Sequence, residues 1–369
     1  MSEPANKDDS APSLPPTERD KRKILLEAVE EAFDGDSVIT YITSTRANLE
    51  VTMAIDIIPL LYTHLESLRA HGKSRRICLF IHSNGGDGVV PWRIVSLIRE
   101  YAEYFTVLVP HRAFSAATLL AMGADRVVMH PMGMLGPIDP TITTDFNPVS
   151  PVNPNQKLGI SVEDVTSYIT LVKEDVGISH EDELVQAFLA LSNQVHPLAL
   201  GNVKRSTLQS RLMGAKLLRS RCANRLPEHE NEDVVRKLTS ELYYHGHPIS
   251  RREARDDLGL TFVEDATDVQ AKAMWDLYAA YAELMLLERP FQPFTEAVRV
   301  LGATPPKPAA PNMPHAQTNV SVLNLTLACL ESVDHFDAFE NDLDITIARD
   351  FTGNTSATFT QTRTEWIVA

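Results

Sequence analysis

The sequence predicts an α/β protein built on a parallel sheet with flanking helices. Apolar or β-branched runs of strand length recur along the chain, at residues 37–43, 75–82, 105–110 and 125–131. Between them lie segments whose apolar residues recur at helical spacing, at residues 53–70, 89–105 and 115–124. Strands that alternate with helices in this way are typical of a parallel sheet with right-handed crossovers. Ligand sites in such sheets lie beyond the carboxyl ends of the strands.

The sequence predicts that the whole chain divides into four regions. Residues 1–23 are polar and rich in proline, which predicts a disordered arm. Residues 24–290 hold the α/β domain, within which residues 133–157 are expected to form a long loop or lid. Residues 291–315 are expected to be a linker, and residues 316–369 alternate like β-strands, which predicts a small β-rich C-terminal extension. Further helices are expected at 24–34, 161–176 (with Ser161 as N-cap and Asp164 at the capping-box position), 196–221, 248–260 (with Ser250 as cap) and 273–288.

Charge and composition argue against several classes of function. The chain has 369 residues and a net charge of -15 at pH 7, which disfavours binding to nucleic-acid phosphates or to anionic lipid. It lacks a run of about 18 apolar residues, so we expect no membrane span. Cys78, Cys222 and Cys329 lie far apart without a CxxC motif, which predicts neither a zinc site nor a disulfide framework. A reduced, cytoplasmic setting fits this cysteine usage best.

Two motifs lie at expected strand ends and contain candidate catalytic groups. In "SNGGDG", residues 83–88, two adjacent glycines let the backbone turn sharply, so that their amides can point into a pocket as an oxyanion hole requires. The same glycines also suit a plain turn before a helix. In "FSAATLLAMGAD", Ser115 opens an apolar helix directly after a strand, as a nucleophile elbow does. A serine in that place is more commonly an N-cap, so both roles stay open on spacing alone.

Taken together, "FIHSNGGD", "FSAATLLAMGAD" and "GPIDP" resemble the Clp-protease/crotonase superfamily. The most similar families are the signal peptide peptidase A enzymes and the serine dehydrogenase proteinases. Their motif order is a glycine turn, a serine that opens a helix, a Gly-Ala-Asp-like turn and a Gly-Ser/Pro-Ile segment. This chain has them in that order, as Gly85-Gly86, Ser115, Gly123-Ala124-Asp125 and Gly136-Pro137-Ile138. The later "YYHGHPISRREARDDLGL" resembles the closing motif of the superfamily, and the resemblance covers residues 37–290.

The resemblance implies a ClpP/crotonase-like fold and a serine peptidase that acts on peptides or proteins. It implies that Ser115 is the nucleophile and that the amides of Gly85 and Ala116 form the oxyanion hole, with Gly86 completing the turn that binds substrate. It further implies a homo-oligomer, with neither a metal nor another cofactor required.

The general base is the open question. Clp-type members use a histidine, but the matching position here, near Pro140, has none. Signal peptide peptidases use a Ser-Lys dyad, and a lysine can serve as base where burial lowers its pKa. Lys204 shares a helical face with two leucines and is the first candidate. The remaining candidates are Lys173 beside an apolar helix face, Lys157 in the lid, and His196 near the family lysine position.

Two other functions stay open at this stage. Without a working base, the chain would be a catalytically inactive assembly or binding protein of the same fold. A crotonase-type enzyme acting on an acyl-thioester would share the fold and the two-amide oxyanion hole, but it needs no serine at position 115.

Overall fold

The computed structural model describes residues 17–73, 75–153, 155–242, 244, 246–302, 316–350 and 352–368. Residues 1–16, most of the expected N-terminal arm, therefore lie outside the described residues. The remainder of that arm is helical, because α1 begins at Glu18 and not at Ile24. A capping box fixes this start: the Thr17 hydroxyl accepts from the Asp20 amide, and the Asp20 carboxylate accepts from the Thr17 amide.

An eight-stranded sheet forms the centre of the molecule, in the order β10-β5-β3-β2-β1-β11-β12-β13. The strands from β10 to β1 all run parallel to their neighbours. They are β1 (Ser37–Thr43), β2 (Arg76–His82), β3 (Tyr104–Val109), β5 (Arg126–Met129) and β10 (Val263–Asp265). Every residue of β1 is buried, as is typical of a parallel strand covered on both faces. The predicted α/β fold class is confirmed.

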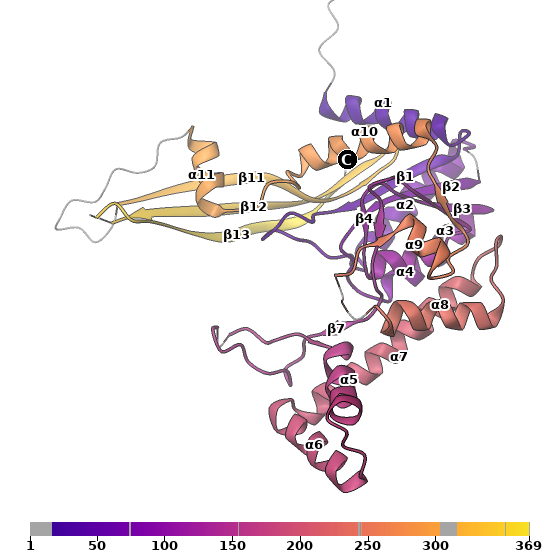
Figure 1. Cartoon of the computed structure of the whole chain (residues 1–369). Helices are drawn as coiled ribbons and strands as arrows, with labels where there is room; N and C mark the ends of the chain where they lie inside the picture. The colour runs from indigo at the N-terminus through magenta and orange to yellow at the C-terminus, as the bar shows by residue number, and fades with distance from the viewer. Residues whose placement is uncertain are drawn as a thin grey trace, which may run out of the picture.

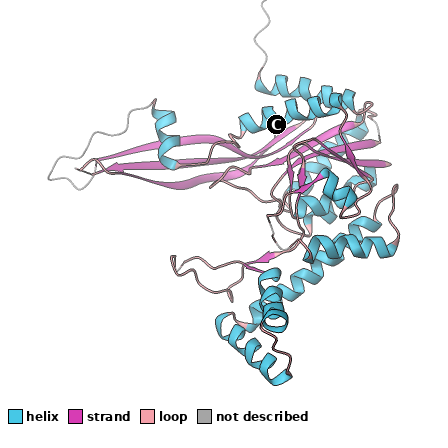
Figure 2. Ribbon diagram, in the orientation of Figure 1, coloured by secondary structure: helices cyan, strands magenta, loops and turns pink. Residues whose placement is uncertain are grey.

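Helices cover both faces of this parallel half of the sheet (Figures 1 and 2). They are α1 (Glu18–Ala32) and α10 (Asp268–Leu284) on one face, and α2 (Ile57–Ala70), α3 (Val90–Tyr101) and α4 (Ala116–Met122) on the other. Leu26 and Leu277 join the first pair to the sheet, and Leu61, Ile94 and Leu120 join the second group. The helices expected at 53–70, 89–105 and 115–124 are thus confirmed as α2, α3 and α4.

A second group of helices extends from the body on the side opposite α1 and α10 (Figure 1). It comprises α5 (Val162–Thr170), the π-helix η1 (Leu171–Asp175), α6 (Glu181–Gln194), α7 (Pro197–Arg219) and α8 (Glu228–Ser240). The short helix α9 (Arg251–Asp256) instead lies in the body, where Ala254 belongs to the main core cluster (Figure 1). Ser161 with Asp164, and Ser250 with Glu253, form the capping boxes that start α5 and α9, which confirms both expected helix starts. Among the described helices, none is long and apolar enough to cross a bilayer.

Short strands frame the region between the sheet and the projecting helices. They are β4 (Arg112–Ala113), β6 (Met134–Leu135) and β9 (Ile249–Ser250) in one small sheet, and β7 (Thr141–Ile142) with β8 (Ile160–Ser161) in another. In residues 133–157, where the sequence predicts a long loop, the described residues form β6, β7, one isolated β-bridge and otherwise turns, bends and irregular backbone. We call residues 139–160 the lid.

The C-terminal segment is β-rich, as expected, and it is continuous with the central sheet. Its strands are β11 (Ala316–Glu331), β12 (Phe336–Arg349) and β13 (Thr355–Val368), and they form an antiparallel meander that projects from the body (Figure 1). β11 pairs with β1, from Thr40 opposite Glu331 to Thr43 opposite Ala328. The expected linker also contains a helix, α11 (Pro293–Leu301), which packs on the meander through Ala297.

Hydrogen bonds to a buried carboxylate connect the meander to the body. Arg22 of α1 donates two hydrogen bonds to the Glu331 carboxylate, and the hydroxyl of Tyr281 on α10 donates a third. All three side chains are almost fully buried. Losing Arg22 or Glu331 would leave a buried charge without its partner, which typically costs about 3–5 kcal/mol. The first helix and the last strands therefore stabilise each other across the whole length of the chain.

The buried His82 and the half-buried His111, both near strand ends, make stability depend on pH. Burial lowers the pKa of His82 well below its usual value, and burial followed by the charge of Arg112 lowers that of His111. Both therefore bind a proton less readily in the fold than in the unfolded chain, where the pKa of histidine is about 6.5. The folded state binds fewer protons there, so the free energy of unfolding should fall as pH drops below about 6.5.

Urea unfolding between pH 8 and pH 5 measures this dependence, over the range in which an unfolded histidine gains its proton at about 6.5. We expect His111→Gln, at a half-buried position, to show a shallower loss of stability than the wild type. Equal pH slopes in the two proteins would contradict this account.

Candidate active site

Ser115 stands at the start of α4 in a backbone conformation that serine rarely adopts. Its φ is 51° and its ψ is -113°, and its side chain makes no capping hydrogen bond. Ser115 thus occupies the N-cap position without acting as a cap. A non-glycine residue held in such a region costs roughly 1–3 kcal/mol, and such strain is concentrated at functional sites. Its hydroxyl makes no hydrogen bond to another residue in the described part of the chain.

Hydrogen bonds on both sides hold this turn in place. Before it, the Phe114 amide donates to the Ser83 carbonyl at 3.0 Å. After it, the Leu119 amide donates to the Ser115 carbonyl at 3.0 Å, the first bond of the helix ladder. Beside it, the Thr118 hydroxyl donates to the Ala113 carbonyl and accepts from the Gly136 amide. These bonds fix Ser115 between the central sheet and the Gly136-Pro137-Ile138 segment.

The glycine turn after β2 lies against Ser115 so closely that only glycine fits. A Cβ on Gly85, where φ is 96°, would lie 2.8 Å from the Ser115 Cβ and 2.9 Å from the Ala116 nitrogen. A Cβ on Gly86 would collide with the Met53 backbone. Met53 in turn holds the glycines, because its amide donates to the Gly85 carbonyl at 2.7 Å. The two motifs singled out in the sequence are therefore in direct contact.

The backbone amides near Ser115 differ in whether they are engaged. The Gly85 amide donates to the Ser83 Oγ at 3.0 Å, and the same Oγ accepts from the Thr43 hydroxyl at 2.8 Å. The amides of Gly86 and Ala116, by contrast, donate to no other residue within the described ranges. The resemblance pairs Gly85 with Ala116 as oxyanion donors. In the structure, the pair left available beside Ser115 is Gly86 and Ala116.

Ser115 opens onto a cleft of about 490 Å³. The lid contributes Thr141 and Thr143, and α7 contributes Ser206 and Gln209. The other lining residues are Thr52, Asn84, Gly85, Gly86, Asp87, Gly88, Ala116, Leu119, Ile138, Pro140 and Ser210. The polar part of this lining consists of hydroxyl and amide side chains, and Asp87 is its charged residue. The cleft has the size of a small-ligand or peptide side-chain site.

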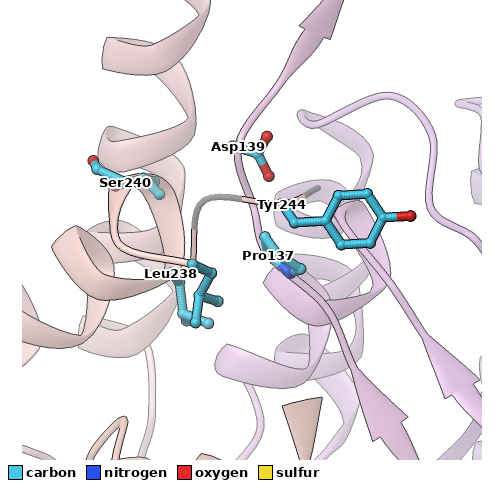
Figure 3. Close-up of a pocket in the computed structure, with 7 residues that line it drawn as sticks. Pro137, Asp139, Leu238, Ser240 and Tyr244 are labelled. Carbon is cyan, nitrogen blue, oxygen red and sulfur yellow. Dashed lines mark hydrogen bonds between the residues drawn. The ribbon is translucent and has the colours of Figure 1, made fainter. Parts of the chain in front are cut away.

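The Gly136-Pro137-Ile138 motif anchors the lid behind this cleft. The Ile138 amide donates to the Leu238 carbonyl of α8 at 2.9 Å, and the Ile138 carbonyl accepts from Ser210 of α7. Pro137 and Asp139 border a small hollow against the end of α8, where Leu238 and Tyr244 lie opposite them (Figure 3). The motif therefore joins α7, α8 and the lid to the turn that carries Ser115.

The Gly-Ala-Asp turn has a structural role that sequence spacing did not indicate. Asp125 is fully buried, and its carboxylate accepts from the amides of Phe105, Cys222 and Ala223 as well as from Arg99. Burial alone would raise the pKa of this carboxyl, but Arg99 and the amides outweigh it and bring the pKa below its usual value. Asp125 thus joins β3 to the end of α7 and stays charged.

No candidate base lines the Ser115 cleft in the described part of the single chain. Lys204 borders a neighbouring hollow between α5 and α7. Its helix face is open, because Leu208 is 52% and Leu212 is 59% exposed. The two leucines on this face are therefore open to solvent and do not bury the Lys204 ammonium group. Helical spacing identified the face correctly but could not tell that it points away from the core.

The remaining candidates also lie outside the cleft. His196 is the N-cap of α7, where its Nδ1 accepts from the Leu198 amide, and its ring stacks on Phe146. Lys173 is exposed on η1. Lys157 is half-buried in the lid, where it bridges to Val149 through the backbone. The described residues contain no group of three or more His, Cys, Asp or Glu that could hold a metal ion.

Residues 53–189 match the family of ClpP-like SDH-type serine proteinases. This segment includes the glycine turn, Ser115 and the lid, so the resemblance expected from the motifs is confirmed there. Over 78 residues the chain is 36% identical to the uncharacterized protein MJ0137 of Methanocaldococcus jannaschii and, over an alignment of the same length, 33% identical to MJ1495 of that organism. Each match covers 21% of this chain, and the chain spans 27% of the length of each relative.

Solved structures with partial likeness have two kinds of activity in their names. One is a mutant of the 1510-N membrane-bound stomatin-specific protease, with 14% identity, a TM-score of 0.26, and coverage of 42% of this chain and 69% of that chain. Another is an enoyl-CoA hydratase from Polaromonas sp. JS666, with 15% identity, a TM-score of 0.32, and coverage of 73% and 82%. Both likenesses are weak.

The strain at Ser115 predicts an unusual effect of substitution. Glycine adopts a φ of 51° freely, whereas alanine keeps the strain while losing the hydroxyl. We expect Ser115→Gly to be more stable than Ser115→Ala by about 1 kcal/mol, measured by denaturant unfolding. A Ser115→Gly protein less stable than Ser115→Ala would show that the backbone is not strained there.

Proposed function

We propose that this protein is a serine peptidase in which Ser115 is the nucleophile. The observation that carries the proposal is the strained turn at Ser115, whose hydroxyl is engaged in no capping bond and opens onto a cleft. The fold does not use this hydroxyl, yet the surrounding bonds hold it in one place. The match of residues 53–189 to a family of serine proteinases supports the same function.

In this proposal the Ser115 Oγ attacks the carbonyl carbon of the scissile peptide bond. The carbonyl oxygen becomes an oxyanion, and the amides of Gly86 and Ala116 donate to it. Preorganised donors of this kind typically contribute about 10²–10³ in rate each. The Gly85 amide instead holds the turn in shape through Ser83. The leaving amine takes a proton from the base, and water then hydrolyses the acyl-enzyme.

The proton acceptor in this proposal is a lysine or histidine that enters the cleft from outside. Lys157 is the candidate within the lid, whose Thr141 and Thr143 already line the cleft. Lys204 lies on α7, two positions before the cleft residue Ser206. Lys173 and His196 would require a larger movement or a second copy of the chain. A homo-oligomer is therefore part of the proposal.

A second function has a specific observation in its favour. Because no lysine or histidine of the described residues lines the cleft, the protein could bind peptides without cleaving them. The activity of the wild type decides between the two functions.

Hydrolysis of a fluorogenic peptide library tests the nucleophile. We expect Ser115→Ala to lower kcat/KM by at least about 10³-fold, because no other group can form the acyl-enzyme. Ser206→Ala is the matched control, since it removes another hydroxyl from the same cleft. Hydrolysis by the Ser115→Ala protein at the wild-type rate would contradict the proposal. An intact wild type that hydrolyses nothing and binds peptides would favour the second function.

The rates of peptide hydrolysis by four single variants identify the base: Lys157→Met, Lys204→Met, Lys173→Met and His196→Gln. Loss of a general base typically costs about 10²–10⁴ in rate, so one variant should fall by that amount while the other three stay near wild type. The same variant should lose the acidic limb of the pH–rate profile. Full activity in all four variants would exclude every candidate.

A further inference from the structure

A second cavity, of about 330 Å³, lies where the meander leaves the body. Its floor is built by four neighbouring strands: Tyr41 on β1, Ala328 on β11, Phe339 on β12 and Trp366 on β13. Ala328 pairs directly with Phe339, and Phe339 pairs directly with Trp366. Because alanine is the small member of this row, it leaves open space between larger aromatic neighbours.

The walls of this cavity combine aromatic rings with carboxylates. The rings of Phe339 and Trp366 lie 5.4 Å apart at 49°. The Trp366 Nε1 donates to the Asp56 carboxylate at 2.8 Å, which fixes the indole beside an acidic group. Glu50 also lines the cavity, is exposed, and forms neither an ion pair nor a hydrogen bond with another described residue. Aromatic faces beside carboxylates attract cations that carry an aliphatic stem.

This cavity adjoins the Ser115 cleft. Thr52 lines both. The segment before α2 forms one wall of the second cavity, through Glu50, Val51, Thr52, Ala54 and Asp56. Met53, between them, points into the core and bonds to the glycine turn on both sides, through the Gly85 carbonyl and the Asp87 amide. A peptide that lies in the Ser115 cleft can therefore continue over Thr52 to the second cavity.

We propose that this cavity is a subsite for a lysine or arginine side chain of the peptide that Ser115 acts on. The inference rests on the proposed function for its substrate, a peptide in extended form. The cationic head lies near Glu50 and Asp56, and the aliphatic stem packs on Trp366 and Phe339. The net charge of -15 favours the approach of basic peptides in general, but only this cavity gives preference to one position in the peptide.

Binding to the Ser115→Ala protein tests the subsite without requiring cleavage. The probes are short fluorescein-labelled peptides of alanine and serine, with one lysine moved along the sequence. Matched peptides carry norleucine, which keeps the aliphatic stem and lacks the ammonium group. At one position we expect lysine to bind about tenfold more tightly than norleucine, as fluorescence anisotropy would measure.

The subsite variant is Glu50→Gln in the Ser115→Ala background, and it should abolish most of that lysine preference. Glu27→Gln is the matched control, because it removes one exposed carboxylate from α1, and it should leave the preference intact. The inference is overturned if no position prefers lysine, or if the preference persists in Glu50→Gln. Equal losses in both variants would show general charge attraction, which also overturns it.

Cleavage of the same peptides by the wild type separates this inference from the proposed function. If the wild type cleaves them with no lysine preference at any position, the peptidase function stands and the subsite falls. If it cleaves none of them, while the Ser115→Ala protein shows a lysine preference that depends on Glu50, the subsite stands and the peptidase function falls.

Discussion

The contact between the glycine turn and Ser115 is the constraint on which the site depends. The two backbones approach so closely that a single Cβ on Gly85 would meet Ser115 itself. This approach requires β2 and the turn after β3 to be fixed by the parallel sheet, and it requires Met53 to hold the glycines from the other side. Strain at Ser115 persists because these neighbours leave the backbone no alternative.

The rest of the molecule is arranged around this contact. The lid and α7 close the cleft with hydroxyl and amide groups, and Ile138 ties both to α8. The meander continues the same sheet away from the site, and its root adds an aromatic and acidic cavity next to the cleft. In the proposed function, a nucleophile at Ser115 that the core holds in place acts with a base that enters the cleft from outside, and the bound peptide extends toward the meander.

Local patterns in the sequence predicted the features that are set by residues close together in the chain. Strand alternation, the capping boxes at Ser161 and Ser250, and the glycine turn beside Ser115 all follow from spacing within one element or one turn. The pairing of β11 with β1 joins segments far apart in the chain, and no local pattern indicates it. The exposed position of Lys204 was missed because helical periodicity does not show which face meets the core. The Ser83 bond to the Gly85 amide depends on a turn geometry that spacing does not determine.

The most direct test of the central claim is where a serine-directed reagent reacts. The intact protein is incubated with a fluorophosphonate, digested, and mapped by mass spectrometry. The account predicts one adduct, on the peptide that contains Ser115, and none after heat unfolding or in the Ser115→Ala protein. An adduct on another serine, or none on a folded protein that hydrolyses peptides, would contradict the assignment of Ser115 as the nucleophile.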